Sequence, residues 1–164
     1  MFPKFDAGVL LLTKAAVVAL LFVMFGATLA GVFFRYALDD ALTWSEEVAR
    51  YSMVWLSFLG GGLVFREGGH VAVDLLLTHL PSRRLRLAVT LLAQVLVMAV
   101  LAVVLWQGVI LMARGQYMTT AALRLPMYVP YAALPVGAGL MIYHLLVTGR
   151  GLIASDTDDA NAPG

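Results

Sequence analysis

Apolar residues dominate four stretches of the chain, and short polar segments separate these stretches. A helix rises ~1.5 Å per residue and the hydrocarbon core of a bilayer is ~30 Å thick, so about 20 apolar residues are needed to cross it. The pattern predicts an all-α integral membrane protein whose four transmembrane helices pack as a bundle. We place these spans at about residues 10–34, 44–65, 85–112 and 127–148.

The first stretch is longer than the apolar part of a secretory signal. Residues 15–34 form a run of 20 residues without a charge, whereas the apolar region of a signal peptide has about 7–15. Residues 28–30 (Thr-Leu-Ala) loosely resemble a cleavage site. The length of the stretch nevertheless favours a helix that stays in the membrane.

The second span needs a charged first turn to reach across the bilayer. Its uncharged part, residues 51–65, has 15 residues, which is only about 22 Å of helix. We therefore start this helix at Trp44. Thr43 and Glu46 have the spacing of a capping box, and Glu46 and Arg50 have the i,i+4 spacing of a favourable ion pair.

Ionisable groups near the membrane interior are costly and usually have a function. Glu46, Glu47 and Arg50 are the strongest candidates in this chain. A helix cap that reaches the headgroups, or a contact with a partner, fits them better than an ion relay, which would need deeper carboxylates without a neighbouring arginine. Arg35 lies across a short connection, and we expect it to join this turn and fix the hairpin of the first two spans.

Small residues and a proline predict how the spans pack and bend. Pro135 lies inside the fourth span and should kink it, because proline lacks the N–H that the helix needs. Small residues four positions apart allow two helices to approach closely. On this basis we expect close packing at Gly26 with Ala30 and at Ala27 with Gly31. The three glycines at residues 60–62 either allow the same close approach or loosen the second helix near its cytoplasmic end.

The segment between the second and third spans has a different pattern. His70, Asp74 and Thr78 repeat every four positions and give one polar stripe on an otherwise apolar segment. Residues 70–80 are too few to span, so they predict a short helix that lies in the cytoplasmic interface. Residues 155–164 are acidic and small and predict a disordered tail. The membrane domain would therefore cover residues 1–154.

The basic residues predict the orientation of the spans. An even number of spans places the two termini and the middle segment on the same side of the membrane. This side holds seven lysines and arginines and the other side holds four, so the positive-inside rule puts both termini in the cytoplasm. The seven are Lys4, Lys14, Arg66, Arg83, Arg84, Arg86 and Arg150, and the four are Arg35, Arg50, Arg114 and Arg124.

The composition of the chain excludes several kinds of functional site. The chain is 62% hydrophobic and 13% charged, while a soluble domain is about a quarter charged. It has no cysteine and a net charge of +1, which excludes thiolate metal sites and gives no reason to expect a nucleic-acid partner. Of the histidines, only His144 lies inside a span, and we interpret it as a residue of the membrane boundary. We therefore expect no catalytic residue, cofactor or metal.

Two other classes of membrane protein fit less well. A membrane anchor subunit of a respiratory enzyme that holds haem would need two histidines inside the spans. A small homo-oligomeric channel or exporter would need deep polar residues on one side of its helices. Only Gln94 and Gln107 are strongly polar within the third span, so the pattern favours a membrane subunit without a pathway of its own.

An ordered set of motifs lies between residues 34 and 81. It comprises Phe-Arg-Tyr at 34–36, Trp-Ser-Glu-Glu-Val-Ala-Arg-Tyr at 44–51, Val-Trp-Leu-Ser-Phe-Leu-Gly at 54–60, Arg-Glu-Gly-Gly-His-Val-Ala-Val-Asp at 66–74, and Leu-Pro at 80–81. Together these motifs resemble the small membrane subunit of TRAP transporters, the Q or DctQ-like subunit. The second half of the chain matches that family only in its hydrophobic layout.

The resemblance implies a subunit of the bacterial inner membrane. In this family the small subunit braces a large membrane subunit, the M subunit, which carries the substrate and sodium sites. A periplasmic substrate-binding protein, the P subunit, delivers organic acids such as dicarboxylates or sialic acid, and the small subunit helps to dock it. The positions carried over have roles in architecture and subunit contact: Arg35, Trp44, Glu46, Glu47, Arg50, Tyr51, Trp55, Arg66, His70 and Asp74.

Overall fold

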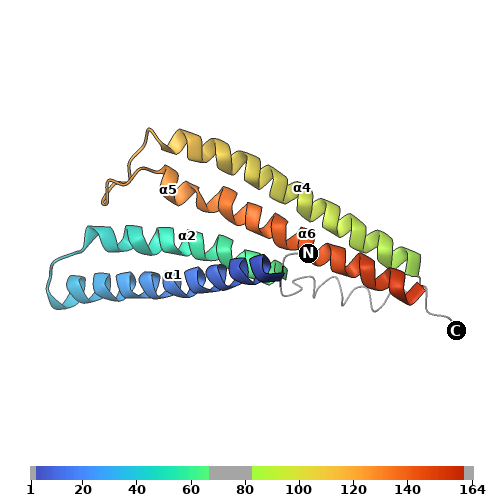
Figure 1. The fold of residues 1–164 in the computed structure, drawn as a ribbon. Helices are drawn as coiled ribbons and strands as arrows, with labels where there is room; N and C mark the ends of the chain where they lie inside the picture. The colour runs from blue at the N-terminus through green and yellow to red at the C-terminus, as the bar shows by residue number, and fades with distance from the viewer. Residues whose placement is uncertain (1–2, 67–82, 161–164) are drawn as a thin grey trace.

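The apolar stretches form helices, because a backbone inside hydrocarbon has no water to satisfy its hydrogen bonds. The computed structural model describes residues 3–66 and 83–160. The helices in this part of the chain are α1 (Pro3–Ala37), α2 (Thr43–Arg66), α4 (Arg83–Gly115), α5 (Tyr128–Tyr131) and α6 (Ala133–Ala160) (Figure 1).

Four segments are long and apolar enough to cross a membrane, and they confirm the all-α fold with four spans. The segments are Asp6–Ala37, Thr43–Arg66, Ala88–Gly115 and Tyr128–Val147. The expected interfacial helix at residues 70–80 lies outside the described residues.

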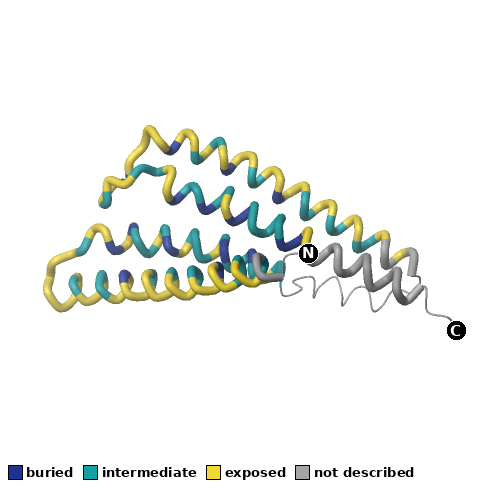
Figure 2. The backbone as a smooth tube through the Cα atoms, in the orientation of Figure 1, coloured by how far each residue is buried: buried dark blue, intermediate teal, exposed yellow. Residues whose placement is uncertain are grey.

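The helices pack as a single layer, whereas we expected a bundle. Within the described residues, α1 packs against α2, α2 against α6, and α6 against α4, so the order across the layer is α1, α2, α6, α4 (Figure 1). A bundle buries apolar faces from water, but lipid tails are as apolar as leucine and remove that driving force. Both faces of the layer therefore stay open, as the exposed positions along α1 and α4 show (Figure 2).

Glycines set the close approach of the central helices. A Cβ added to Gly62 of α2 would lie 2.8 Å from Cδ2 of Leu140 on α6, and one added to Gly108 of α4 would lie 3.0 Å from Cδ of Pro135. Side chains larger than hydrogen do not fit at these points without a shift of the neighbour. Glycine in the spans therefore has a packing role at both faces of α6.

The α1–α2 contact uses one of the two small-residue pairs expected from the sequence. Ala27 is buried, and a Cβ on Gly31 would lie 2.5 Å from Oγ of Ser45 on α2. Gly26 is exposed, and a Cβ there would meet nothing within 4 Å. The pair of Ala27 and Gly31 thus faces α2, whereas Gly26 points away from it.

The fourth span is interrupted close to its proline. A turn at Ala132 separates α5 from α6, three residues before Pro135. Pro135 has no N–H to donate to Tyr131, one turn earlier, and its ring crowds that carbonyl. Hydrogen bonds from Ala132 N to Tyr128 O (2.9 Å) and from Val136 N to Ala132 O (3.1 Å) carry the backbone through the interruption.

The last helix is longer than the sequence predicted. α6 continues to Ala160, so residues 155–160 are helical where we expected the start of a disordered tail. A helix that is already formed gains one hydrogen bond for each residue it adds, and no proline follows Pro135 until Pro163. Residues 161–164 lie outside the described part of the chain.

Candidate functional site

Polar side chains gather at the two ends of the helix layer. We name the end that holds the connections 38–42 and 116–127 the loop end, and the opposite end, where α1 begins and α2 ends, the terminal end (Figure 1). Each end has a cluster of hydrogen bonds that joins different elements of the chain. These two clusters form the candidate site, because ionisable groups within spans are costly unless they are paired.

At the loop end, Glu47 of α2 binds the backbone of the 116–127 connection. Its Oε1 accepts hydrogen bonds from the N–H of Ala121 (3.0 Å) and the hydroxyl of Tyr51 (3.1 Å), and its Oε2 accepts from the N–H of Ala122 (3.1 Å) and Leu123 (2.7 Å). Successive backbone N–H groups that converge in this way form an anion-binding concavity. Glu47 is only 8% exposed, and these bonds compensate for its burial.

The 116–127 connection has a fixed internal structure. Thr120 is fully buried; its N–H donates to the carbonyl of Leu125 (2.8 Å), and its Oγ1 accepts from the N–H of Leu125 (3.0 Å). Met127 N donates to Met118 O at 2.8 Å. Arg124 has a φ of 53°, in the left-handed region. The loop is thus folded on itself and presents its amides to Glu47.

The sequence did not predict that backbone amides would bind Glu47. The amides of residues 121–123 belong to Ala-Ala-Leu, which has no polar side chain. Binding through backbone N–H groups leaves no residue-type signature. The sequence feature that marks this loop is the pair of threonines, Thr119 and Thr120, directly before its turn.

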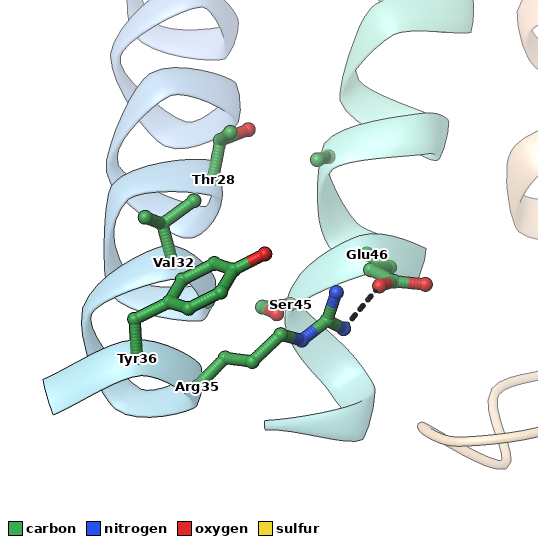
Figure 3. A pocket seen from close by; sticks show the side chains of 8 residues that line it. Thr28, Val32, Arg35, Tyr36, Ser45 and Glu46 are labelled. Atoms are coloured by element: carbon green, nitrogen blue, oxygen red, sulfur yellow. Dashed lines mark hydrogen bonds and ion pairs between the residues drawn. The ribbon is translucent and has the colours of Figure 1, made fainter. Parts of the chain in front are cut away.

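The loop end also holds an ion pair between α1 and α2. Nη2 of Arg35 lies 2.5 Å from Oε1 of Glu46, and the two side chains are 50% and 61% exposed. Figure 3 shows Arg35 extending from α1 toward α2. Arg35 lines a cavity of about 350 Å³ between these helices. The structure thus shows the expected Arg–Glu contact across the hairpin. Side chains from both helices line the cavity: Thr28, Gly31, Val32, Arg35, Tyr36, Ser45, Glu46 and Ala49.

Two local interactions predicted for this turn do not form. Glu46 pairs with Arg35 and not with Arg50, which is exposed and takes part in no ion pair of the described residues. Thr43 is the first residue of α2 itself, and the first turn is closed by the N–H and hydroxyl of Ser45, which both donate to Leu42 O. The capping box is therefore absent, because Arg35 takes the carboxylate that it requires.

At the terminal end, Asp6 joins three helices. Arg66 of α2 binds Asp6 of α1 through both guanidinium Nη atoms, one to each carboxylate oxygen. The hydroxyl of Tyr143 on α6 donates to Oδ1 of Asp6 at 3.3 Å. A bidentate pair of this kind fixes orientation as well as distance. Arg66 was assigned to architecture from the sequence, whereas Asp6 and Tyr143 were not singled out.

His144 lies beside this cluster in a position that the sequence did not predict. We expected it at the membrane boundary, but it is fully buried. Its ring packs edge-on against Tyr143, with centroids 5.3 Å apart. Neither ring nitrogen has a hydrogen-bond partner among the described residues. Its burial follows from its position on the face of α6 that Gly137 and Leu140 turn toward α2.

The remaining predicted positions are dispersed. Trp44 is partly exposed at the loop end, and Trp55 lines a groove of about 480 Å³ between α1, α2 and α6. His70 and Asp74 lie outside the described residues. In residues 3–66 and 83–160 no group of three or more histidine, aspartate or glutamate side chains has the arrangement of a metal site.

Comparisons with known proteins match this chain to membrane transport subunits. Residues 24–154 match the family described as the DctQ component of tripartite ATP-independent periplasmic transporters. The chain is 33% identical over 137 residues to the isethionate TRAP transporter permease protein DctMQ of Oleidesulfovibrio alaskensis, which covers 80% of this chain and 21% of that protein.

Two further relatives are C4-dicarboxylate TRAP transporter small permease proteins named DctQ. The protein of Rhodobacter capsulatus is 31% identical over 112 residues, 67% of this chain and 49% of its own length. The protein of Vibrio cholerae is 25% identical over 155 residues, 80% of this chain and 66% of its own length. The chain thus spans from about a fifth to two thirds of these relatives. Since the family match covers most of the chain, it belongs to the DctQ family, as a multi-pass small permease subunit of a TRAP transporter in the inner membrane and not an enzyme.

Proposed function

We propose that this chain is the scaffold subunit of a sodium-coupled, binding-protein-dependent importer of organic acids. It braces the large membrane subunit and helps to dock the periplasmic substrate-binding protein. The observation that carries this proposal is the single layer of helices. At its two edges, α1 packs mainly against α2, and α4 packs against α5 and α6. A layer of this kind encloses no passage between its helices within the described residues.

The distribution of charge supports a bracing role. Asp6, Arg66 and Glu47 are bound to groups of the same chain at the ends of the layer. A substrate or ion pathway needs polar groups that are available near the middle of the membrane. In this chain such groups join the helices to each other, and the substrate and sodium sites are assigned to the large subunit.

The relatives support an organic anion as substrate without selecting one. Their names include isethionate, a sulfonate, and C4-dicarboxylates. The relatives of this chain are named for different anions. This difference supports a model in which the other components of the transporter select the substrate. The isethionate permease protein matches this chain over 21% of its own length, so the substrate in its name is that of a much longer protein.

The loop end is the proposed docking face for the periplasmic protein. The count of basic residues places the termini in the cytoplasm and hence the loop end in the periplasm. Exposed at this end are the side chains of Arg50, Arg114, Tyr117 and Arg124. Glu47 binds the backbone of the 116–127 connection, which supports fixed backbone positions for Tyr117 and Arg124 before a partner binds.

Reconstitution into proteoliposomes tests the proposal. We expect no uptake of an organic acid by this chain alone, and sodium-dependent uptake when the large subunit and the binding protein are added. The large subunit and binding protein without this chain should give at least tenfold less uptake. Uptake by the chain alone, or full uptake in its absence, would show that it is not a scaffold.

A further inference from the structure

Gln107 lies in a chemically unfavourable position on α4. Its side chain is exposed on α4, the helix that forms one edge of the layer. It lies seven residues before Arg114, or about 10 Å along the helix axis, and 19 residues after Ala88, at the start of the apolar span. Gln107 therefore lies within the apolar span, about two helical turns before its end.

The packing of α4 shows that Gln107 does not face the rest of the layer. Leu101, Gly108 and Gly115 are buried at a spacing of seven residues and form the row that faces α5 and α6. Gln94 continues this row, and its side chain is half-buried. Gln107 lies outside the row.

Two other exposed polar groups of the spans, the hydroxyls of Thr28 and Ser57, are satisfied within their own helix. The hydroxyl of Thr28 donates to Met24 O and that of Ser57 donates to Met53 O, both at 2.8 Å. Gln107 has two amide donors and a carbonyl acceptor, and none of them has a partner among the described residues. Hydrocarbon offers no hydrogen bond, so an amide directed into lipid is strongly disfavoured.

We infer that the face of α4 around Gln107 is the contact surface for a helix of the large membrane subunit, with a hydrogen-bonding group opposite the Gln107 amide. This inference rests on the proposed scaffold function and adds the location of the contact. Amide side chains hydrogen-bond across transmembrane helices, whereas lipid tails cannot. Val100 and Val103, one to two turns from Gln107, are 62% and 60% exposed and extend the surface.

A matched pair of substitutions on α4 tests the contact. Gln107→Leu and Gln94→Leu make the same chemical change, on the exposed side and on the α6-facing row. We expect Gln107→Leu to reduce recovery of the large subunit with the tagged chain, in mild detergent, by about fivefold or more. Gln94→Leu should match the wild type. Equal recovery with both variants would overturn the inference.

Cross-linking identifies the neighbour directly. The chain has no cysteine, so Gln107→Cys and Gln94→Cys each give a single attachment point for a photoactivated cross-linker. In membranes containing the complex, position 107 should form an adduct with the large subunit and position 94 should not. An adduct of two copies of this chain, or labelling of lipid alone at position 107, would overturn the inference. If the wild-type chain fails to recover the large subunit at all, the proposed function fails as well.

Discussion

Glu46 and Glu47 are neighbours in the sequence, yet their carboxylates have different surroundings. Glu46 is exposed and pairs with Arg35, also exposed. Exposed ion pairs contribute little, about 0–1 kcal/mol, because water and salt screen them. Glu47 is buried and binds three backbone amides and a tyrosine hydroxyl. Its removal would leave three backbone N–H groups and a tyrosine hydroxyl without this acceptor, which is the more costly change.

Substitution of the two glutamates by alanine should separate these effects. We expect Glu47→Ala to lower the free energy of unfolding by about 3 kcal/mol, since a buried charged acceptor with several donors is lost. Glu46→Ala should lower it by less than about 1 kcal/mol. Denaturation of the purified chain in detergent, followed by tryptophan fluorescence, measures both. Equal losses would mean that Glu47 does not hold the 116–127 connection.

His144 is expected to have the opposite effect to Glu47, because a buried polar group without hydrogen bonds lowers the stability of the fold. Both its ring nitrogens lack a partner within the described residues. We expect His144→Leu, which removes these polar atoms, to leave the free energy of unfolding unchanged or to raise it by about 1 kcal/mol. Tyr143→Phe removes the donor to Asp6 and should lower it by about 1 kcal/mol. The same fluorescence measurement applies. A loss above 1 kcal/mol for His144→Leu would mean that the ring nitrogens are bonded by a group not yet described.

At the scale of helices, the sequence predicted the positions of the spans well, but it did not predict which helices pack against each other. The spans follow from length and apolarity, since only helices satisfy the backbone in lipid. The order of the helices depends on local shape, such as the fit of Leu140 to Gly62, and apolar residues on every side of a helix give no hint of it. Asp6 and Arg66 are 60 positions apart and their pairing likewise depends on the helix order.

Gly108 and Gly26 illustrate this difference, because only Gly26 belonged to an expected packing pair. A Cβ on Gly108 would meet Leu134 and Pro135 at 3.0 Å, whereas one on Gly26 would meet nothing within 4 Å. We expect Gly108→Leu to lower the free energy of unfolding by about 1–3 kcal/mol through overpacking of α4 against α6. Gly26→Leu should be close to neutral. Unfolding of both variants in detergent checks the pair, and a neutral Gly108→Leu would contradict the observed packing.

At the scale of the whole molecule, the two polar clusters fix the layer at both ends. Glu47 ties α2 to the connection between α4 and α5, while Asp6 ties α1 to α2 and α6. The apolar faces between these ends remain free for other helices or lipid. A subunit that is fixed internally at its two ends and apolar on both faces fits the bracing role proposed for it.

The orientation of the layer decides which cluster faces the periplasm. The positive-inside rule predicts that the termini lie in the cytoplasm and the loop end in the periplasm. Tyr117 at the loop end is 86% exposed, and Leu85 at the terminal end is also exposed. In a chain without cysteine, Tyr117→Cys should react with a membrane-impermeant maleimide added to cells with a permeabilised outer membrane. Leu85→Cys should react only after the inner membrane is also opened. The reverse pattern would place the Glu47 cluster in the cytoplasm and exclude the loop end as the docking face for a periplasmic protein.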